Sequence, residues 1–141
     1  MAMFIVVNGL DQGDPFSGIC YLIYNADLMK IPIPRLGERI LLFVDDAAVI
    51  ITGKDFSETH AKLWDIMNHT GGIFKWARDH NCEFGIEKFQ LLDITRRLAP
   101  NPLNPRKRIP MPRRTLILSD KCIPSKDMAR FLGMIVDNKM N

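Results

Sequence analysis

Two adjacent aspartates, Asp45 and Asp46, are the residues whose types and spacing best suit chemistry. They interrupt a stretch in which residues 40–44 and 47–51 are otherwise apolar. Two carboxylates held at one turn repel each other unless a cation or a proton neutralises them. Hard divalent ions such as Mg²⁺ take one or two carboxylates together with substrate phosphates, so the pair indicates a metal–nucleotide site. Polar hairpin turns also favour aspartate, and this plain alternative stays open for the pair taken alone.

The residues on both sides of the pair predict a β-hairpin with a carboxylate tip. Residues 39–52 are dense in Ile, Leu, Phe and Val, as expected of two short strands. Adjacent side chains in one strand point to opposite faces, but at a tight turn both can reach the same rim. The hairpin is therefore the element that must position the two carboxylates.

A glycine-rich segment precedes the hairpin and predicts a capped helix. Asp14 stands at the N-cap and Pro15 at the first helical position, so we expect a helix over residues 16–29. Its N-terminal amides could meet a phosphate, and Gln12 offers both a donor and an acceptor beside Gly13. Taken alone, the segment is explained equally well by a helix that is merely capped.

The remaining pattern predicts an α+β fold with a largely antiparallel sheet and two helices packed on one face. Ser57 is expected to cap the second helix, which Gly71 and Gly72 weaken. Residues 82–94 are expected to be extended. Residues 115–119 and Ile123 are expected to form a hairpin that turns at residues 120–121, and residues 130–137 a last strand. The three histidines lack acidic or cysteine partners at metal spacing, so we expect structural or solvated side chains.

The second half of the chain is basic. Residues 1–70 hold five Lys and Arg against nine Asp and Glu, whereas residues 71–141 hold fourteen against seven. Residues 99–114 contain five of the nine prolines and are expected to form an extended loop. Its basic side chains suit phosphate contacts along a nucleic acid, a nuclear-import signal or a solvated loop. These candidate contacts are Arg106, Lys107, Arg108, Arg113 and Arg114.

Four segments, taken in order, resemble motifs of reverse transcriptases. Gly-Leu-Asp-Gln-Gly-Asp-Pro-Phe-Ser at residues 9–17 resembles their Gln-Gly motif, and Phe-Val-Asp-Asp at 43–46 resembles their aromatic-x-Asp-Asp motif. Residues 82–89 look like the segment whose lysine lies near the incoming triphosphate, and 131–137 are similar to the Phe-Leu-Gly strand of non-LTR retrotransposon enzymes. Residues 57–94 look closest to fungal LINE-type elements. This sequence departs mildly from the family's Gln-Gly motif. It has Asp11 where proline is usual, Phe16 where leucine is usual and Gly18 where proline is frequent.

The resemblance implies a partial reverse transcriptase domain over residues 1–141, namely the palm subdomain of a right-hand polymerase. It implies RNA-directed DNA polymerase chemistry with Mg²⁺ or Mn²⁺, bound directly by Asp45 with Asp46 close by. It also implies contacts of Gln12 and Gly13 with nucleotide or template. Phe43 would pack beneath the primer terminus, and Lys88 would protonate or neutralise the leaving pyrophosphate. The implied partners are an RNA template with a DNA primer, a dNTP, and the fingers and thumb of the polymerase.

The family's first palm motif, which supplies another metal-binding aspartate, should precede Gly9, and the sequence has only eight residues there. We therefore expect no polymerisation by this chain alone. The alternative is a non-catalytic nucleic-acid-binding remnant of a retrotransposon. An RNA-templated RNA polymerase is disfavoured because Phe-Val-Asp-Asp stands in place of Gly-Asp-Asp, and an unfolded fragment is a further possibility.

Composition limits the class of protein. A content of 47% hydrophobic and 25% charged residues is ordinary for a folded domain and unlike that of a disordered chain. No apolar stretch approaches the ~20 residues of a membrane span, and the apolar N-terminus has no basic n-region. Three widely spaced cysteines fit neither a disulfide framework nor a zinc site. We expect an intracellular protein, nuclear or cytoplasmic, that is neither secreted nor membrane-bound.

Overall fold

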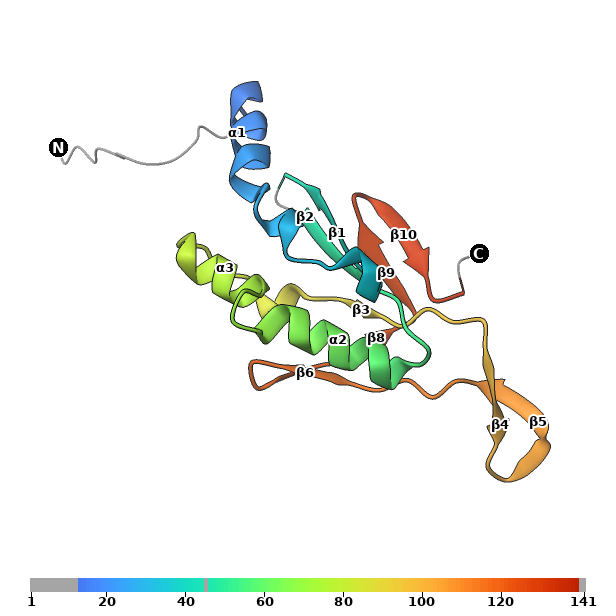
Figure 1. The fold of residues 1–141 in the computed structure, drawn as a ribbon. Coiled ribbons are helices and arrows are strands. Elements are labelled where there is room, and N and C mark those ends of the chain that lie inside the picture. Colours follow the sequence, from blue (N-terminus) through green and yellow to red (C-terminus); the bar gives the residue numbers. More distant parts are fainter. Residues whose placement is uncertain (1–12, 45, 140–141) are drawn as a thin grey trace.

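Among the residues that the structure describes, three α-helices and one hairpin occupy the first part of the chain and paired short strands the rest, a mixed α+β arrangement that agrees with the predicted α+β class (Figure 1). The computed structural model describes residues 13–44 and 46–139. In this part of the chain the α-helices are α1 (Pro15–Asn25), α2 (Phe56–Asn68) and α3 (Ile73–Asp79). Short 3₁₀ turns span Leu28–Lys30, Pro34–Leu36 and Ile86–Lys88.

The strands are short, and each pairs with one other within the described residues. They are β1 (Glu38–Phe43), β2 (Asp46–Ile51), β3 (Leu91–Leu92), β4 (Leu98–Asn101), β5 (Asn104–Pro110), β6 (Leu116–Leu118), β7 (Lys121–Ile123), β8 (Ser125–Lys126), β9 (Met128–Phe131) and β10 (Met134–Asp137). Four pairs are antiparallel hairpins, and β3 with β8 is parallel. The antiparallel character agrees with the prediction, whereas a single continuous sheet does not form among these residues, because each hairpin satisfies its own strands locally.

The core lies where α2 and α3 meet the hairpins. Its buried side chains are Leu28, Ile40, Ile66, Met67, Ile73, Trp76, Ala77, Leu91, Leu116, Leu118 and Ile123. Strand β6 shows how the pattern selects a face, because Leu116 and Leu118 are buried while Ile117 between them is exposed. Helix α2 turns Ile66 and Met67 inward from its last turn.

Helix α1 begins as predicted and ends earlier. Oδ1 of Asp14 accepts a hydrogen bond from the Phe16 amide at 3.0 Å, and Pro15 occupies the first helical position. The expected helix over residues 16–29 stops at Asn25, and the 3₁₀ turn Leu28–Lys30 follows before the prolines. The tighter turn lets the chain reverse toward β1, which an uninterrupted helix would not allow.

Helix α2 starts at a different cap from the predicted one. Asp55, not Ser57, accepts from the Glu58 amide at 2.9 Å, and Glu58 accepts in return from the Lys54 amide at 2.8 Å. This reciprocal arrangement resembles a capping box and satisfies two amides at once, which explains why Asp55 prevails. The Lys62 ammonium and the Lys54 amide lower the pKa of Glu58, which keeps the cap charged.

The predicted break near Gly71 and Gly72 is confirmed, because α2 ends at Asn68 and α3 begins at Ile73. A Cβ added at Gly72 would lie 2.6 Å from the Ile66 carbonyl oxygen. Any side chain there would therefore force the two helices apart.

Residues 98–110 form a hairpin arm within the range predicted as an extended loop, whereas residues 111–114 carry no strand. Strands β4 and β5 pair from Leu98 with Pro110 to Asn101 with Asn104, and Figure 1 shows the pair projecting from the body in orange. Oδ1 of Asn101 accepts from the Leu103 amide at 2.8 Å, so an Asx turn builds the tip. Prolines on both strands donate no ladder hydrogen bonds, which suits an arm of two edge strands.

The last predicted strand, residues 130–137, is instead the hairpin of β9 and β10. It turns at Leu132 and Gly133, whose φ angles of 50° and 78° suit a tight two-residue turn. The hairpin expected from 115–119 to Ile123 is confirmed as β6 and β7, although its turn falls at Ser119 and Asp120, one residue earlier. Residues 82–94 hold the 3₁₀ turn Ile86–Lys88 and β3 in place of continuous extended structure.

None of the helices in the described part of the chain has the length and apolar character needed to cross a membrane.

Candidate functional site

The hairpin of β1 and β2 forms where the sequence predicts it, with Asp46 as the first residue of β2. Phe43 pairs with Asp46 across the last rung, and Val44 begins the turn between the strands. The side chains of Phe43 and Asp46 are both exposed. Asp45 lies outside the described residues, as does Gln12, whereas Gly13 is exposed just before the helix cap.

Helix α1 fixes the turn through a buried amide. Nδ2 of Asn25, a residue only 7% exposed, donates to the Val44 carbonyl oxygen at 2.9 Å. Val44 has a φ of 52°, a rare conformation for a β-branched residue that costs about 1–3 kcal/mol. Asn25 therefore holds a strained residue beside the aspartates. Sequence reasoning missed Asn25, although an amide closing an otherwise apolar helix was a usable signal.

A second contact ties the same helix to α3. The Tyr24 hydroxyl donates to the His80 carbonyl oxygen, and its ring meets Trp76 edge-on at 5.7 Å between centroids. Burial raises the pKa of Tyr24, with Cys82 adding to the shift. Helix α1 is thus fastened to the helical layer at the end that reaches the aspartate turn.

A cleft of about 270 Å³ adjoins the turn. It is bordered by α1, by the aspartate hairpin and by residues 82–85, including Val44 and Gly85. Lys88, three residues beyond Gly85, is exposed at the end of the 3₁₀ turn Ile86–Lys88. The fold therefore brings the lysine-bearing segment beside the hairpin, with Lys88 itself on the surface.

The carboxylate of Asp46 is of a type that a hard divalent cation binds. Asp46 presents a carboxylate at an exposed rim, and oxygen donors of this kind suit Mg²⁺ or Mn²⁺ that shares substrate phosphates. Within residues 13–44 and 46–139 no three His, Cys, Asp or Glu side chains are grouped to hold a metal ion. Asp45, the other proposed ligand, is outside that range.

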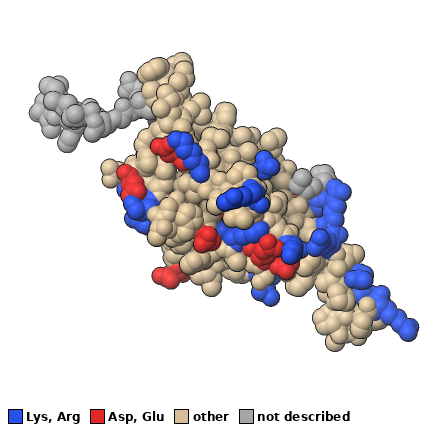
Figure 2. Space-filling view, viewed as in Figure 1, with Lys and Arg blue, Asp and Glu red and all other residues tan. Residues whose placement is uncertain are grey.

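The hairpin arm is the second candidate surface. Residues 94–119 contain seven Lys and Arg and no Asp or Glu. Arg106, Lys107 and Arg108 are exposed on β5, and strand alternation places Lys107 on the face opposite the two arginines. Figure 2 shows basic side chains along this projecting part of the molecule. Both faces of the arm can therefore meet phosphates.

The two remaining basic candidates sit at the foot of the arm and differ from those on β5. Arg113 donates to Oδ1 of Asp127 at 2.8 Å and to the Lys126 carbonyl oxygen at 3.1 Å. Its guanidinium already braces the chain against the segment before β9. Arg114 is exposed and lines a cleft against α2.

One histidine has an acidic partner that lies far away in the sequence, in a structural role that agrees with the prediction. Nε2 of His60 on α2 lies 2.8 Å from Oδ1 of Asp93, and both side chains are buried, at 12% and 5% exposure. The other oxygen, Oδ2 of Asp93, is buried without a hydrogen-bond partner in the described part of the chain. The two residues are 33 positions apart, so only the fold reveals the pair.

Comparisons with protein-family models, with curated proteins and with solved structures find no match for this chain. Function is accordingly inferred from the geometry of the aspartate hairpin and of the arm, together with the motifs that the sequence carries.

Proposed function

We propose that this chain is palm-subdomain sequence of an RNA-directed DNA polymerase of the non-LTR retrotransposon type. One observation carries the proposal: the helix that follows the Gln-Gly segment anchors the turn of the hairpin beside Asp46, through Asn25. The Asn25 hydrogen bond to Val44 links the two motifs physically, although about thirty residues separate them in sequence.

In this proposal each described residue has a distinct task at the turn. Asp46 presents oxygen ligands, while Asn25 keeps the backbone of Val44 in the conformation that aims the turn. Phe43, exposed opposite Asp46, offers an apolar platform for a primer terminus. When bound, Mg²⁺ activates the primer 3′-hydroxyl and neutralises the leaving pyrophosphate. Lys88 contributes a positive charge from the adjoining segment.

The partners in this proposal include a template–primer, a dNTP and the fingers and thumb of the polymerase. The outer face of α1 supports a protein neighbour, because large apolar side chains are exposed along it. These are Phe16, Ile19, Leu22 and Ile23. An apolar patch of this kind usually marks an interaction surface.

Metal-directed cleavage tests the metal site without requiring polymerase activity. Fe²⁺ substitutes for Mg²⁺ at oxygen sites, and with ascorbate and peroxide it generates radicals that cut the nearest backbone. We expect Mg²⁺-competable cuts of the full chain around residues 44–47, detected by mass spectrometry. Replacing both Asp45 and Asp46 with asparagine should abolish these cuts, because the amides lose the anionic oxygen ligands.

Asp120→Asn is the matched control, because Asp120 is also an exposed aspartate at a hairpin turn. This variant should be cut at residues 44–47 like the wild type. Cuts that persist after the double replacement, or that never centre on the hairpin, would contradict the metal site. Primer extension on an RNA template by the same chain, abolished by Asp45→Asn, would overturn our expectation that it does not polymerise alone.

The hairpin arm favours a second candidate, a nucleic-acid-binding segment without catalysis. Its support is the run of seven basic residues without an acidic one over residues 94–119, part of it on an exposed projection. Binding of a primer–template that is indifferent to Asp45→Asn would favour this candidate over the polymerase.

Serine at Arg106, Lys107 and Arg108 together is expected to raise the Kd for an oligonucleotide about 10–100-fold at low salt. The slope of log Kd against log salt should fall by about two, since three fewer cations displace counterions. Fluorescence anisotropy over a salt series measures both quantities.

The control for this experiment removes the same charge elsewhere, through serine at Arg35, Arg39 and Arg78, which are exposed outside the arm. If the control weakens binding as much as the arm variant does, net charge rather than the arm determines affinity.

A further inference from the structure

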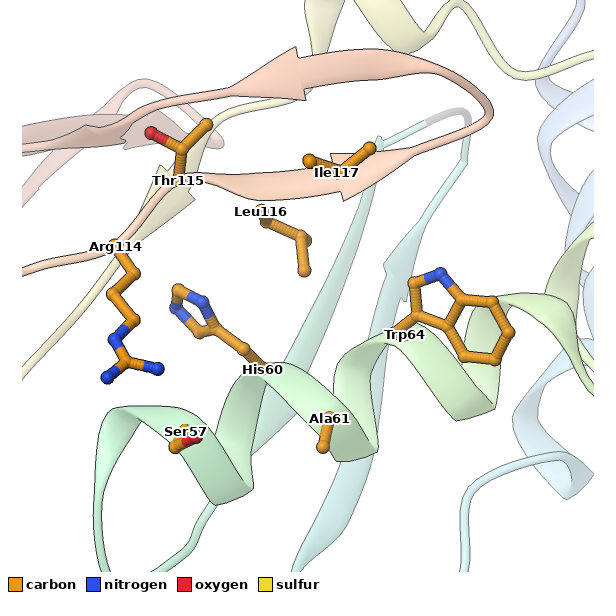
Figure 3. Close-up of a pocket in the computed structure, with 8 residues that line it drawn as sticks. All are labelled: Ser57, His60, Ala61, Trp64, Arg114, Thr115, Leu116 and Ile117. Carbon is orange, nitrogen blue, oxygen red and sulfur yellow. The ribbon is translucent and has the colours of Figure 1, made fainter.

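A second cleft lies between α2 and β6, on elements that the aspartate hairpin does not use. It is shallow and open to solvent, with a volume of about 390 Å³. Figure 3 shows His60 rising from α2 toward Leu116 of β6, with Trp64 at one end and Arg114 at the other. The cleft therefore presents an aromatic ring and a guanidinium at its two ends.

The aromatic end is Trp64, which packs incompletely in this chain. It is 52% exposed, whereas Ile66 and Met67 of the same helix are buried in the core. A half-exposed indole offers a flat apolar face at which a nucleobase can stack, and stacking contributes about 1–3 kcal/mol per base whatever its sequence. Packing in the core therefore does not explain why a tryptophan stands at this position.

The charged end is Arg114, the last basic residue of the acid-free run over residues 94–119. The described residues that line the cleft include Arg114 and no Asp or Glu. A guanidinium without a carboxylate beside it in the lining favours an anionic ligand over a neutral one. The Ser57 hydroxyl lies at the same end in Figure 3 and adds a donor for a phosphate oxygen.

We infer that this cleft binds one unpaired nucleotide of a single-stranded nucleic acid, with the base on Trp64 and its phosphate on Arg114. A duplex does not fit this role, because its bases are stacked and paired on one another. The cleft continues the basic arm onto the body of the protein, since five residues join β5 to β6 through Arg113 and Arg114. The inference rests on the proposed function only in taking a nucleic acid as the partner.

The two tryptophans give the test a site-specific signal. Trp64 is half exposed, whereas Trp76 is 8% exposed and stacked on His80. We expect an oligothymidylate of about eight nucleotides, added to the full chain at low salt without metal, to quench Trp64. Trp64→Leu should remove the quenching and raise the Kd, followed by anisotropy, about 5–100-fold. Trp64→Phe should restore most of the affinity, because the ring still stacks.

Arg114→Gln should weaken both quenching and affinity, while Arg78→Gln, an exposed arginine on α3, should leave them unchanged. Oligonucleotide binding that depends on the arm residues but never quenches Trp64 would refute nucleotide binding in the cleft. It would leave the proposal of nucleic-acid binding by the arm in place. If the chain binds no oligonucleotide at all, both nucleotide binding in the cleft and a nucleic-acid partner for the chain are refuted. A stronger Trp64 response to an acidic peptide of equal charge would make a peptide the occupant and refute the nucleotide assignment.

Discussion

Replacing His60 with leucine is expected to lower the free energy of unfolding by about 3–5 kcal/mol. Leucine fills similar space but removes the donor to Oδ1 of Asp93, whose other oxygen already lacks a partner among the described residues. A buried carboxylate would then have neither oxygen paired. Removing one member of a buried pair is costly for this reason, even where the intact pair adds little net stability. Urea unfolding followed by circular dichroism measures the loss.

The double variant His60→Leu with Asp93→Asn separates the stranded charge from lost packing. Asparagine carries no charge to desolvate, so the double variant should be more stable than His60→Leu alone. A loss below about 1 kcal/mol for His60→Leu, or no recovery in the double variant, would show that Asp93 reaches water or another donor.

Replacing Leu118 with alanine is expected to cost about 2–5 kcal/mol, because the side chain is only 2% exposed and its removal leaves a cavity. Leu118 lies where β6 closes the core against α2 and α3. A domain of this size has a total stability of about 5–15 kcal/mol, so the change approaches the limit of folding. The midpoint of thermal or urea unfolding reports the effect.

Ile117→Ala is the matched control, since Ile117 is the neighbouring residue of the same strand and is 58% exposed. It should change stability by no more than about 0.5 kcal/mol. Similar losses at both positions would mean that the strand's faces are not sorted as the structure has them, because a one-residue shift in register exchanges buried and exposed side chains.

Local signals in the sequence predicted the elements whose hydrogen bonds close within a few residues. Asp14 and Pro15 specify the start of α1, and the two glycines at 71–72 specify the break between α2 and α3. The aspartate hairpin followed from two apolar strands around a polar turn. Each of these depends on backbone conformation and on neighbours in sequence, which a sequence displays directly.

The errors arose where several local solutions compete. Ser57 and Asp55 are both good caps, and only Asp55 has Glu58 three residues later to return the hydrogen bond. Clustered prolines suggested a loop over residues 99–114, but proline is tolerated in paired edge strands, and asparagine side chains built the turn. The strand over 130–137 was divided by a turn at Leu132, where a positive φ is unexpected for leucine.

At the candidate site, the residue types supply the chemical groups, and the packing of helices and hairpins supplies the contacts that hold those groups in place. The aspartate pair, the Gln-Gly segment and the basic run are evident from residue types and order, because carboxylates and guanidinium groups bring their chemistry with them. The hydrogen bonds of Asn25 to Val44 and of His60 to Asp93, and the presence of Trp64 and Arg114 in the lining of one cleft, join distant segments. Such pairings follow from how helices and hairpins pack, which no local pattern encodes.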